Sequence, residues 1–86
     1  MTSKEYRITC RMAKQAADVA CMNMEKAYAN YSMEELNKAY TEAMNRINKA
    51  MAPFEAEFQL IAKSEVSKCY TELANELESL YADGLI

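Results

Sequence analysis

The sequence predicts an all-α fold: a small three-helix bundle, or a bent helical hairpin, completed by homo-oligomerisation. Only one glycine and one proline occur among the 86 residues, so almost no position disfavours a helix. Apolar residues recur at spacings of three and four nearly end to end, which is the period of one helix face. A chain of this length buries only about 60–65% of its unfolded surface. We therefore expect residues 1–86 to form a single helical domain with a thin core.

The first helix is expected over residues 3–30, with Ser3 as the N-cap. Its apolar seam alternates spacings of four and three and contains four alanines, so a neighbouring helix can lie close at modest hydrophobic gain. The seam consists of Tyr6, Cys10, Ala13, Ala17, Ala20, Met24, Ala27 and Tyr31. Met24 and Tyr31 are assigned to the core. Met12 and Val19 widen the stripe, so we expect a second copy, in a homodimer, to cover part of this helix.

The second helix is expected over residues 33–51, because Ser32 and Glu35 match the S-x-x-E capping box. Its seam consists of Met33, Leu36, Tyr40, Ala43, Ile47, Ala50 and Phe54. Charges alternate in sign along another face, which is the pattern of a solvated surface.

Pro53 marks the next boundary, because proline is tolerated at the first position of a helix and disrupts a helix interior. We expect a third helix over residues 53–82, with Gly84 as its C-terminal cap. The alternative is a kink at Pro53 within one long helix. The third seam consists of Phe58, Ala62, Val66, Cys69, Leu73, Leu77 and Leu80.

Residues suited to catalysis are scarce. The chain has no histidine, and no glycine-rich phosphate loop is present. Its three cysteines, Cys10, Cys21 and Cys69, form no C-x-x-C pair, and we expect them to be reduced and buried. The sequence therefore predicts no enzyme, no cofactor and no metal site.

Charge is distributed unevenly along the chain, although the net charge is only −3. Residues 1–31 carry five cations against three acids, whereas residues 52–86 carry two against seven. Four cations share one face of the first helix, and a nucleic-acid-associated regulator that uses them is the alternative function. These cations are Lys4, Arg7, Arg11 and Lys14.

Methionine and tyrosine are enriched, and both residue types favour protein interfaces. The candidate partner-binding residues lie beside the seams, and an acidic stripe of the third helix joins them. They are Met22, Tyr28, Met44, Met51, Tyr70 and Tyr81, with Glu65, Glu72 and Glu76. The predicted function is stoichiometric protein binding, as by a small inhibitor or an adaptor. A secretion-type chaperone and a self-assembling structural subunit are further alternatives.

In size and composition the chain resembles compact accessory proteins of phages and mobile elements, including inhibitors of host defence, and small secretion chaperones. No apolar run approaches the roughly 20 residues of a membrane span, and early charges argue against a signal peptide. We therefore expect a cytoplasmic protein with no membrane partner.

Overall fold

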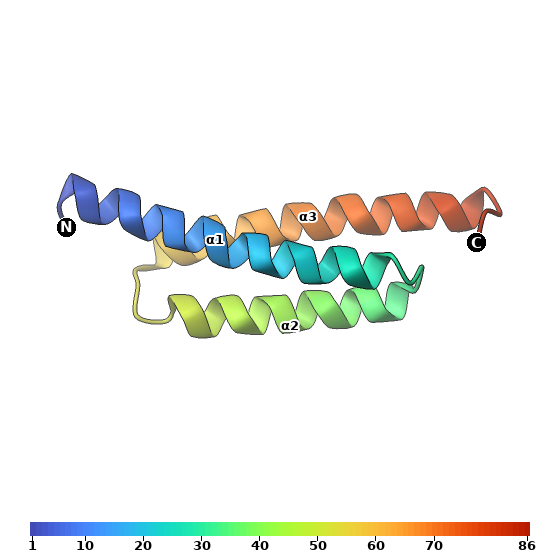
Figure 1. Cartoon of the computed structure of the whole chain (residues 1–86), viewed down its shortest axis with the longest axis horizontal. Coiled ribbons are helices and arrows are strands. Elements are labelled where there is room, and N and C mark those ends of the chain that lie inside the picture. The colour runs from blue at the N-terminus through green and yellow to red at the C-terminus, as the bar shows by residue number, and fades with distance from the viewer.

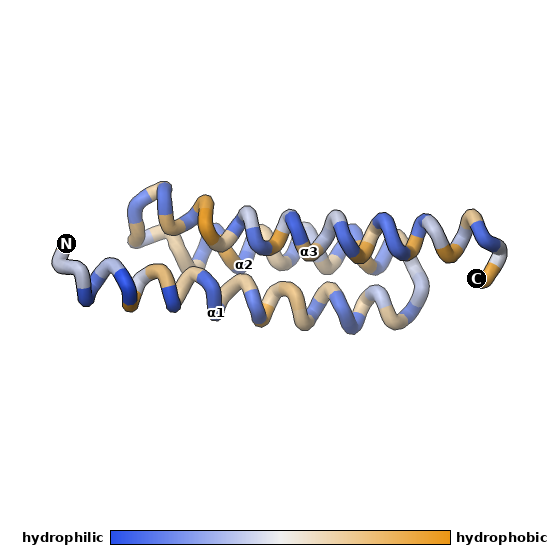
Figure 2. Tube along the Cα trace, turned by 90° about the horizontal axis from the view of Figure 1, so that it is seen from above, coloured by the Kyte–Doolittle hydropathy of each residue, from blue (hydrophilic) through white to orange (hydrophobic).

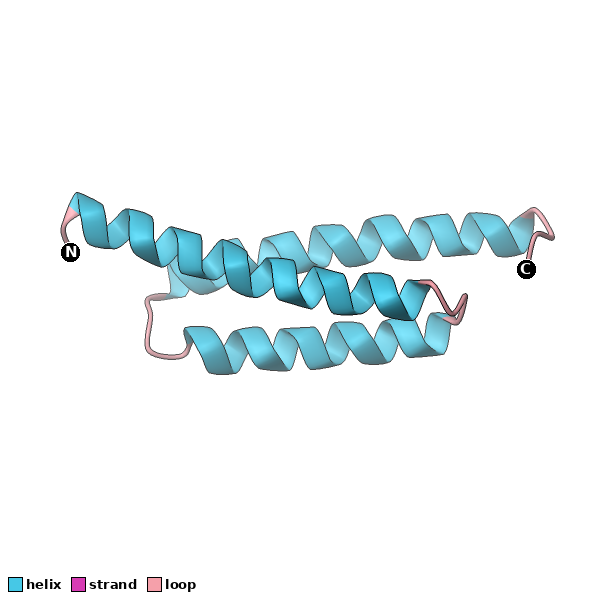
Figure 3. Cartoon of the chain, viewed as in Figure 1, coloured by secondary structure: helices cyan, strands magenta, loops and turns pink.

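Three helices packed against one another form the molecule, which a computed structural model describes over all 86 residues. They are α1 (Ser3–Tyr28), α2 (Met33–Met51) and α3 (Ala56–Ala82), and no strand is present (Figures 1 and 3). α1 and α3 run in the same direction, with α2 antiparallel to both (Figure 1). The prediction of an all-α three-helix bundle is confirmed.

The three helices are staggered along a rod of 53 × 19 × 17 Å. The start of α1 extends past α2 at one end of the rod, and the last turns of α3 extend past the α1–α2 turn at the other (Figure 1). The two termini therefore lie at opposite ends. No side chain is buried over residues 3–8 or 78–86, so the core occupies only the middle of the rod.

Side chains from all three helices form the core, and the predicted seams supply most of them. Hydrophilic and hydrophobic positions alternate along every helix (Figure 2). In α1 the buried apolar residues are three alanines and one methionine, so the core side of this helix is narrow and permits close packing. The thirteen buried apolar residues are Ala13, Ala17, Ala20, Met24, Leu36, Ala43, Ile47, Met51, Phe58, Ala62, Val66, Ala74 and Leu77.

The N-cap of α1 is Thr2, one residue before the expected Ser3, because Thr2 and Glu5 form a capping box. The Glu5 N–H donates to Thr2 Oγ1 at 3.1 Å, and the Thr2 N–H donates to Glu5 Oε2 at 3.4 Å. α1 ends at Tyr28, and Tyr31 lies in the turn with φ 54°. The assignment of Tyr31 to the core is wrong, since this side chain is 50% exposed.

α2 occupies the range expected from the sequence, and the Glu35 N–H donates to Ser32 Oγ at 3.2 Å. Its seam ends differently from the prediction: Ala50 is exposed and Met51 is buried. Ala50 and Met51 follow Ile47 by three and four residues, so helical spacing allows either of them to continue the apolar stripe. The stripe turns toward Met51 because the chain there bends toward α3, where Gln59 Nε2 donates to the Met51 carbonyl oxygen at 3.3 Å.

Pro53 lies in the α2–α3 connection, and the chain reverses direction there instead of kinking (Figure 1). α3 starts at Ala56, later than expected, because the reversal uses Phe54 and Glu55 as well, the latter with extended backbone. The helix ends at Ala82 as predicted, and Gly84 follows the C-cap residue with a φ of 71°, which suits glycine. The Gly84 N–H donates to the Tyr81 carbonyl at 3.1 Å and the Leu85 N–H to the Leu80 carbonyl at 3.0 Å, which is a Schellman motif.

Candidate protein-interaction site

The outward face of α1 carries a line of large apolar side chains that nothing in the fold covers. Ile8, Met12, Val19 and Met22 are 48%, 43%, 54% and 57% exposed, and we call them the α1 apolar stripe. With exposed Gln15 they follow spacings of four, three, four and three, the rhythm of a helix-packing seam. α1 thus has two seams: an alanine-rich one that faces the bundle and a bulkier one that faces outward.

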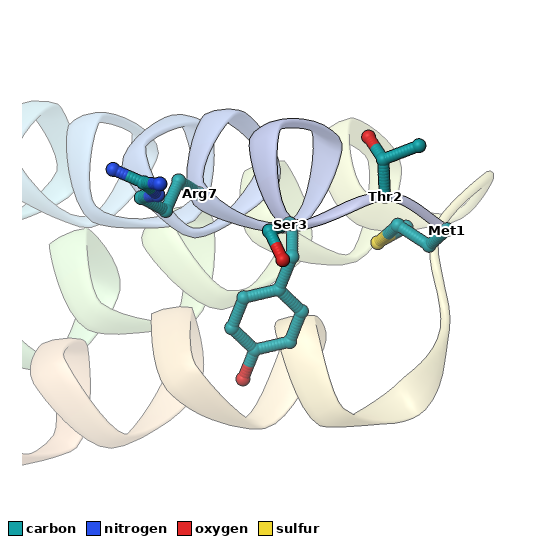
Figure 4. Close-up of a pocket in the computed structure, with 5 residues that line it drawn as sticks. Met1, Thr2, Ser3 and Arg7 are labelled. Carbon is teal, nitrogen blue, oxygen red and sulfur yellow. The ribbon is translucent and has the colours of Figure 1, made fainter.

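The four predicted cations border the α1 apolar stripe, and we call them the basic stripe: Lys4, Arg7, Arg11 and Lys14. All four are exposed. One shallow depression is lined by Lys4, Arg7, Ile8 and Arg11, so cations and an apolar side chain share its wall. Figure 4 shows a second depression, at the very start of the helix, which is lined by Met1, Thr2, Ser3, Tyr6 and Arg7.

The predicted acidic residues of α3 are exposed, but they lie along the contact with α1. The Cys21 thiol donates to the Glu65 carbonyl oxygen at 4.0 Å. Burial raises the pKa of Cys69, and the Glu25 and Glu72 carboxylates raise it further. Burial raises the pKa of Tyr28, and the neighbouring Glu76 carboxylate raises it further. Glu65, Glu72 and Glu76 thus form a rim beside α1.

Cys21 and Cys69 bring two thiols together between α1 and α3, although they are 48 residues apart in the chain. Both side chains are half-buried. Burial, then a hydrogen bond to Cys69, raises the pKa of Cys21 to about 12, and burial also raises the pKa of Cys69. Both thiols are therefore held protonated and weakly nucleophilic at neutral pH.

The other predicted partner-binding residues fall into different environments. Met22 and Tyr81 are exposed, and the Tyr81 hydroxyl also donates to the Tyr31 carbonyl oxygen. Tyr28 and Met44 are half-buried and pack against the core. Met51 is only 1% exposed, so its assignment to the interface is corrected: it is a core residue.

Tyr70 is also placed differently from the expectation, because it joins α3 to α2. Its ring stacks on Tyr40, with centroids 4.4 Å apart, and its hydroxyl donates to Asn37 Oδ1. Most of the contact surface of Tyr70 is therefore used within the bundle. Of the six predicted methionines and tyrosines, only Met22 belongs to the outward face of α1.

Sequence reasoning missed Ile8 and treated Met12 and Val19 as side chains that widen the core seam. The signal that identifies them is the second rhythm at positions 8, 12, 15, 19 and 22, which lies opposite the alanine-rich seam. A helix with two such seams has one more apolar face than the other two helices of a bundle can cover.

No group of three or more cysteine, aspartate or glutamate side chains is placed to hold a metal ion. None of the three helices combines the length and the apolar character needed to cross a bilayer. Comparison of the chain with protein-family models yields no match, and comparison with curated proteins and with solved structures yields none either.

Proposed function

We propose that this protein acts without catalysis, by stoichiometric binding of a protein through the outward face of α1. The observation that carries the proposal is the α1 apolar stripe, four large apolar side chains exposed in a line on one helix. Single exposed apolar residues are ordinary on protein surfaces, whereas a contiguous line of them is typical of an interaction site. Covering a partner's surface in this manner is how a small inhibitor or an adaptor works.

The chemistry of the face defines the partner that fits it. The α1 apolar stripe requires an apolar groove or a second apolar helix face, in the manner of helix-in-groove recognition. The basic stripe beside it requires acidic groups along one edge of that groove. Charges at such an edge steer the encounter and select the partner more than they add affinity.

Capture from host-cell lysate tests the proposal, with Met22→Glu as the disrupting variant and Leu60→Glu as its matched control. Leu60 is 63% exposed on α3, so both variants place a carboxylate at an exposed apolar position. We expect one protein to be retained in stoichiometric amount after nuclease treatment, to be lost with Met22→Glu and to persist with Leu60→Glu. Equal loss with both variants, or the retention of neither a foreign protein nor an untagged copy of the chain, would overturn the assignment of the face.

Nucleic-acid binding is the second candidate, supported by the exposure of all four cations of the basic stripe. Four phosphate contacts on duplex DNA would give a slope of about −3.6 in log K against log salt concentration. The test is fluorescence anisotropy with a labelled duplex at several salt concentrations, comparing the protein with a variant in which the four cations are glutamine. A slope near zero, or an unchanged slope in the variant, would eliminate this candidate.

A further inference from the structure

Charged residues along one edge of the α1 apolar stripe change sign halfway along the helix. Lys4, Arg11, Asp18 and Glu25 are spaced seven residues apart, so they lie on one edge of the same face, and all four are exposed. The first two are cations and the last two are anions. Two copies of this edge laid antiparallel therefore place the cations of each copy opposite the anions of the other.

The α1 apolar stripe can also be read in the opposite direction. Ile8 and Met12 lie seven and three residues before Gln15, and Val19 and Met22 lie four and seven residues after it, so its two halves are nearly symmetric about Gln15. Two copies of α1 laid antiparallel, with Gln15 near the two-fold axis, place Ile8 of one copy against Val19 and Met22 of the other. The stripe is about 21 Å long at 1.5 Å per residue, and every apolar member meets another apolar member.

We propose that the partner of this face is a second copy of the chain, bound antiparallel through α1 in a two-fold homodimer. This inference rests on the proposed function, because it names the occupant of the same face. In the dimer Lys4 pairs with Glu25 of the second copy, and Arg11 pairs with Asp18 of the second copy. The two-fold axis produces each ion pair twice, as expected for an interface that uses the same patch on both subunits.

A parallel pair of α1 helices does not combine apolar contact with charge complementarity, and neither does a dimer through α2 or α3. In a parallel pair, the cationic halves of the two α1 helices lie side by side and so do the anionic halves, so the edge loses its complementarity. The antiparallel arrangement also opposes the dipoles of the two α1 helices. Neither α2 nor α3 offers an equivalent helix face: no large apolar side chain of α2 is exposed, and on α3 the exposed Leu60 and Tyr81 are 21 residues apart.

The size of the face sets the affinity to expect. A surface one helix wide and about 21 Å long is smaller than the ~800 Å² per partner of a standard interface. We therefore expect a reversible dimer with a Kd in the micromolar range, observed at tens to hundreds of micromolar protein.

The decisive experiment uses two charge reversals, Arg11→Glu and Asp18→Arg, in sedimentation equilibrium. Each variant alone sets like charges opposite each other twice, so we expect the Kd of its homodimer to rise by about tenfold or more. A mixture of the two variants restores both ion pairs, so the mixture is expected to form a heterodimer of near wild-type affinity. Lys38→Glu on α2, which makes the same charge change as Arg11→Glu, is expected to leave the dimer intact.

A second pair of variants tests the apolar part of the interface. Val19→Glu should give a monomer at all concentrations, and Leu60→Glu should dimerise as the wild type does; helical circular dichroism verifies that both fold. A monomeric wild-type protein, or a mixture of charge variants that dimerises no better than either variant alone, would overturn the antiparallel dimer. If the wild-type protein is monomeric but binds a foreign protein, and Met22→Glu abolishes that binding, the proposed function stands and only the identity of the occupant is wrong. If a dimer forms but Val19→Glu leaves it intact, the face itself has been misassigned.

Discussion

Tyr40 and Tyr70 stack across the contact between α2 and α3, with ring centroids 4.4 Å apart and planes inclined by 30°. Each hydroxyl reaches the helix that carries the other ring. Tyr70 donates to Asn37 Oδ1 on α2, and the Tyr40 hydroxyl lies 3.4 Å from Ser67 Oγ on α3. The stack therefore fixes both the spacing and the register of the two helices.

Removing this pair should weaken the α2–α3 contact. Tyr70→Phe is expected to lower the free energy of unfolding by about 1 kcal/mol, the usual net value of one hydrogen bond. Tyr40→Ala also removes the ring contact and should cost about 2 kcal/mol or more. Urea unfolding followed by circular dichroism measures both variants, and an unchanged midpoint for Tyr40→Ala would show that the stack contributes nothing.

Alkaline pH should destabilise the fold through Cys21. The folded chain holds the pKa of this thiol at about 12, against 9.0 for an unperturbed thiol. Below about pH 9 both states keep the proton and the contribution to stability is complete; between pH 9 and 12 only the unfolded state ionises, so stability falls as pH rises. Urea midpoints measured from pH 7 to 11 test this, since Cys21→Ala should flatten the decline. Part of the decline should remain in Cys21→Ala, because the pKa of Cys69 is raised in the same direction.

Phe58 is the largest fully buried side chain, and its ring centroid lies 5.4 Å from that of Tyr6. Phe58→Ala is expected to cost about 3–5 kcal/mol, because it leaves a cavity at the start of α3. Leu60→Ala, two residues away and exposed, should change the stability by no more than about 0.5 kcal/mol. Thermal unfolding separates the two variants, and a similar melting temperature for both would contradict the assignment of Phe58 to the core.

Two N-cap residues should matter in proportion to their hydrogen bonds. Thr2→Ala and Ser32→Ala each remove a side-chain oxygen that accepts from a backbone N–H, at an expected cost of about 1 kcal/mol. Ser3→Ala is the control, because the capping residue of α1 is Thr2. A loss of stability in Ser3→Ala as large as that in Thr2→Ala would mean that the helix begins where the sequence pattern first suggested.

Periodicity predicts the middle of each helix well, because each central turn has helices on two sides. Ala13, Ala17, Ala20 and Met24 are buried as the α1 seam predicts, and Phe58, Ala62 and Val66 as the α3 seam predicts. The pattern fails at the ends of the helices. Tyr6 and Tyr31 continue the seam but are exposed, since the stagger and the turn leave fewer neighbours there.

The candidate site was only partly predictable from the sequence. The basic stripe follows from helical spacing alone, and its four cations are exposed. The α1 apolar stripe could not be derived from the sequence, because the same broad apolar pattern also occurs in helices that are covered on several sides. Only the placement of α2 and α3 on the alanine side decides that Met12 and Val19 face outward. The adjacent thiols of Cys21 and Cys69 depend on the register between α1 and α3, which no local pattern encodes.

Because the helices are staggered, the protection of backbone amides from exchange should depend on their position along the rod and not on which helix they belong to. Amide hydrogens in the central block, where three helices surround the core, should exchange with solvent only when the whole bundle opens. Those at the start of α1 and in the last turns of α3 belong to residues whose own side chains are not buried, and they should exchange through local fraying. Protection in a hydrogen-exchange experiment should therefore be graded within α1 and within α3, rising from the free end of each helix toward the centre of the rod.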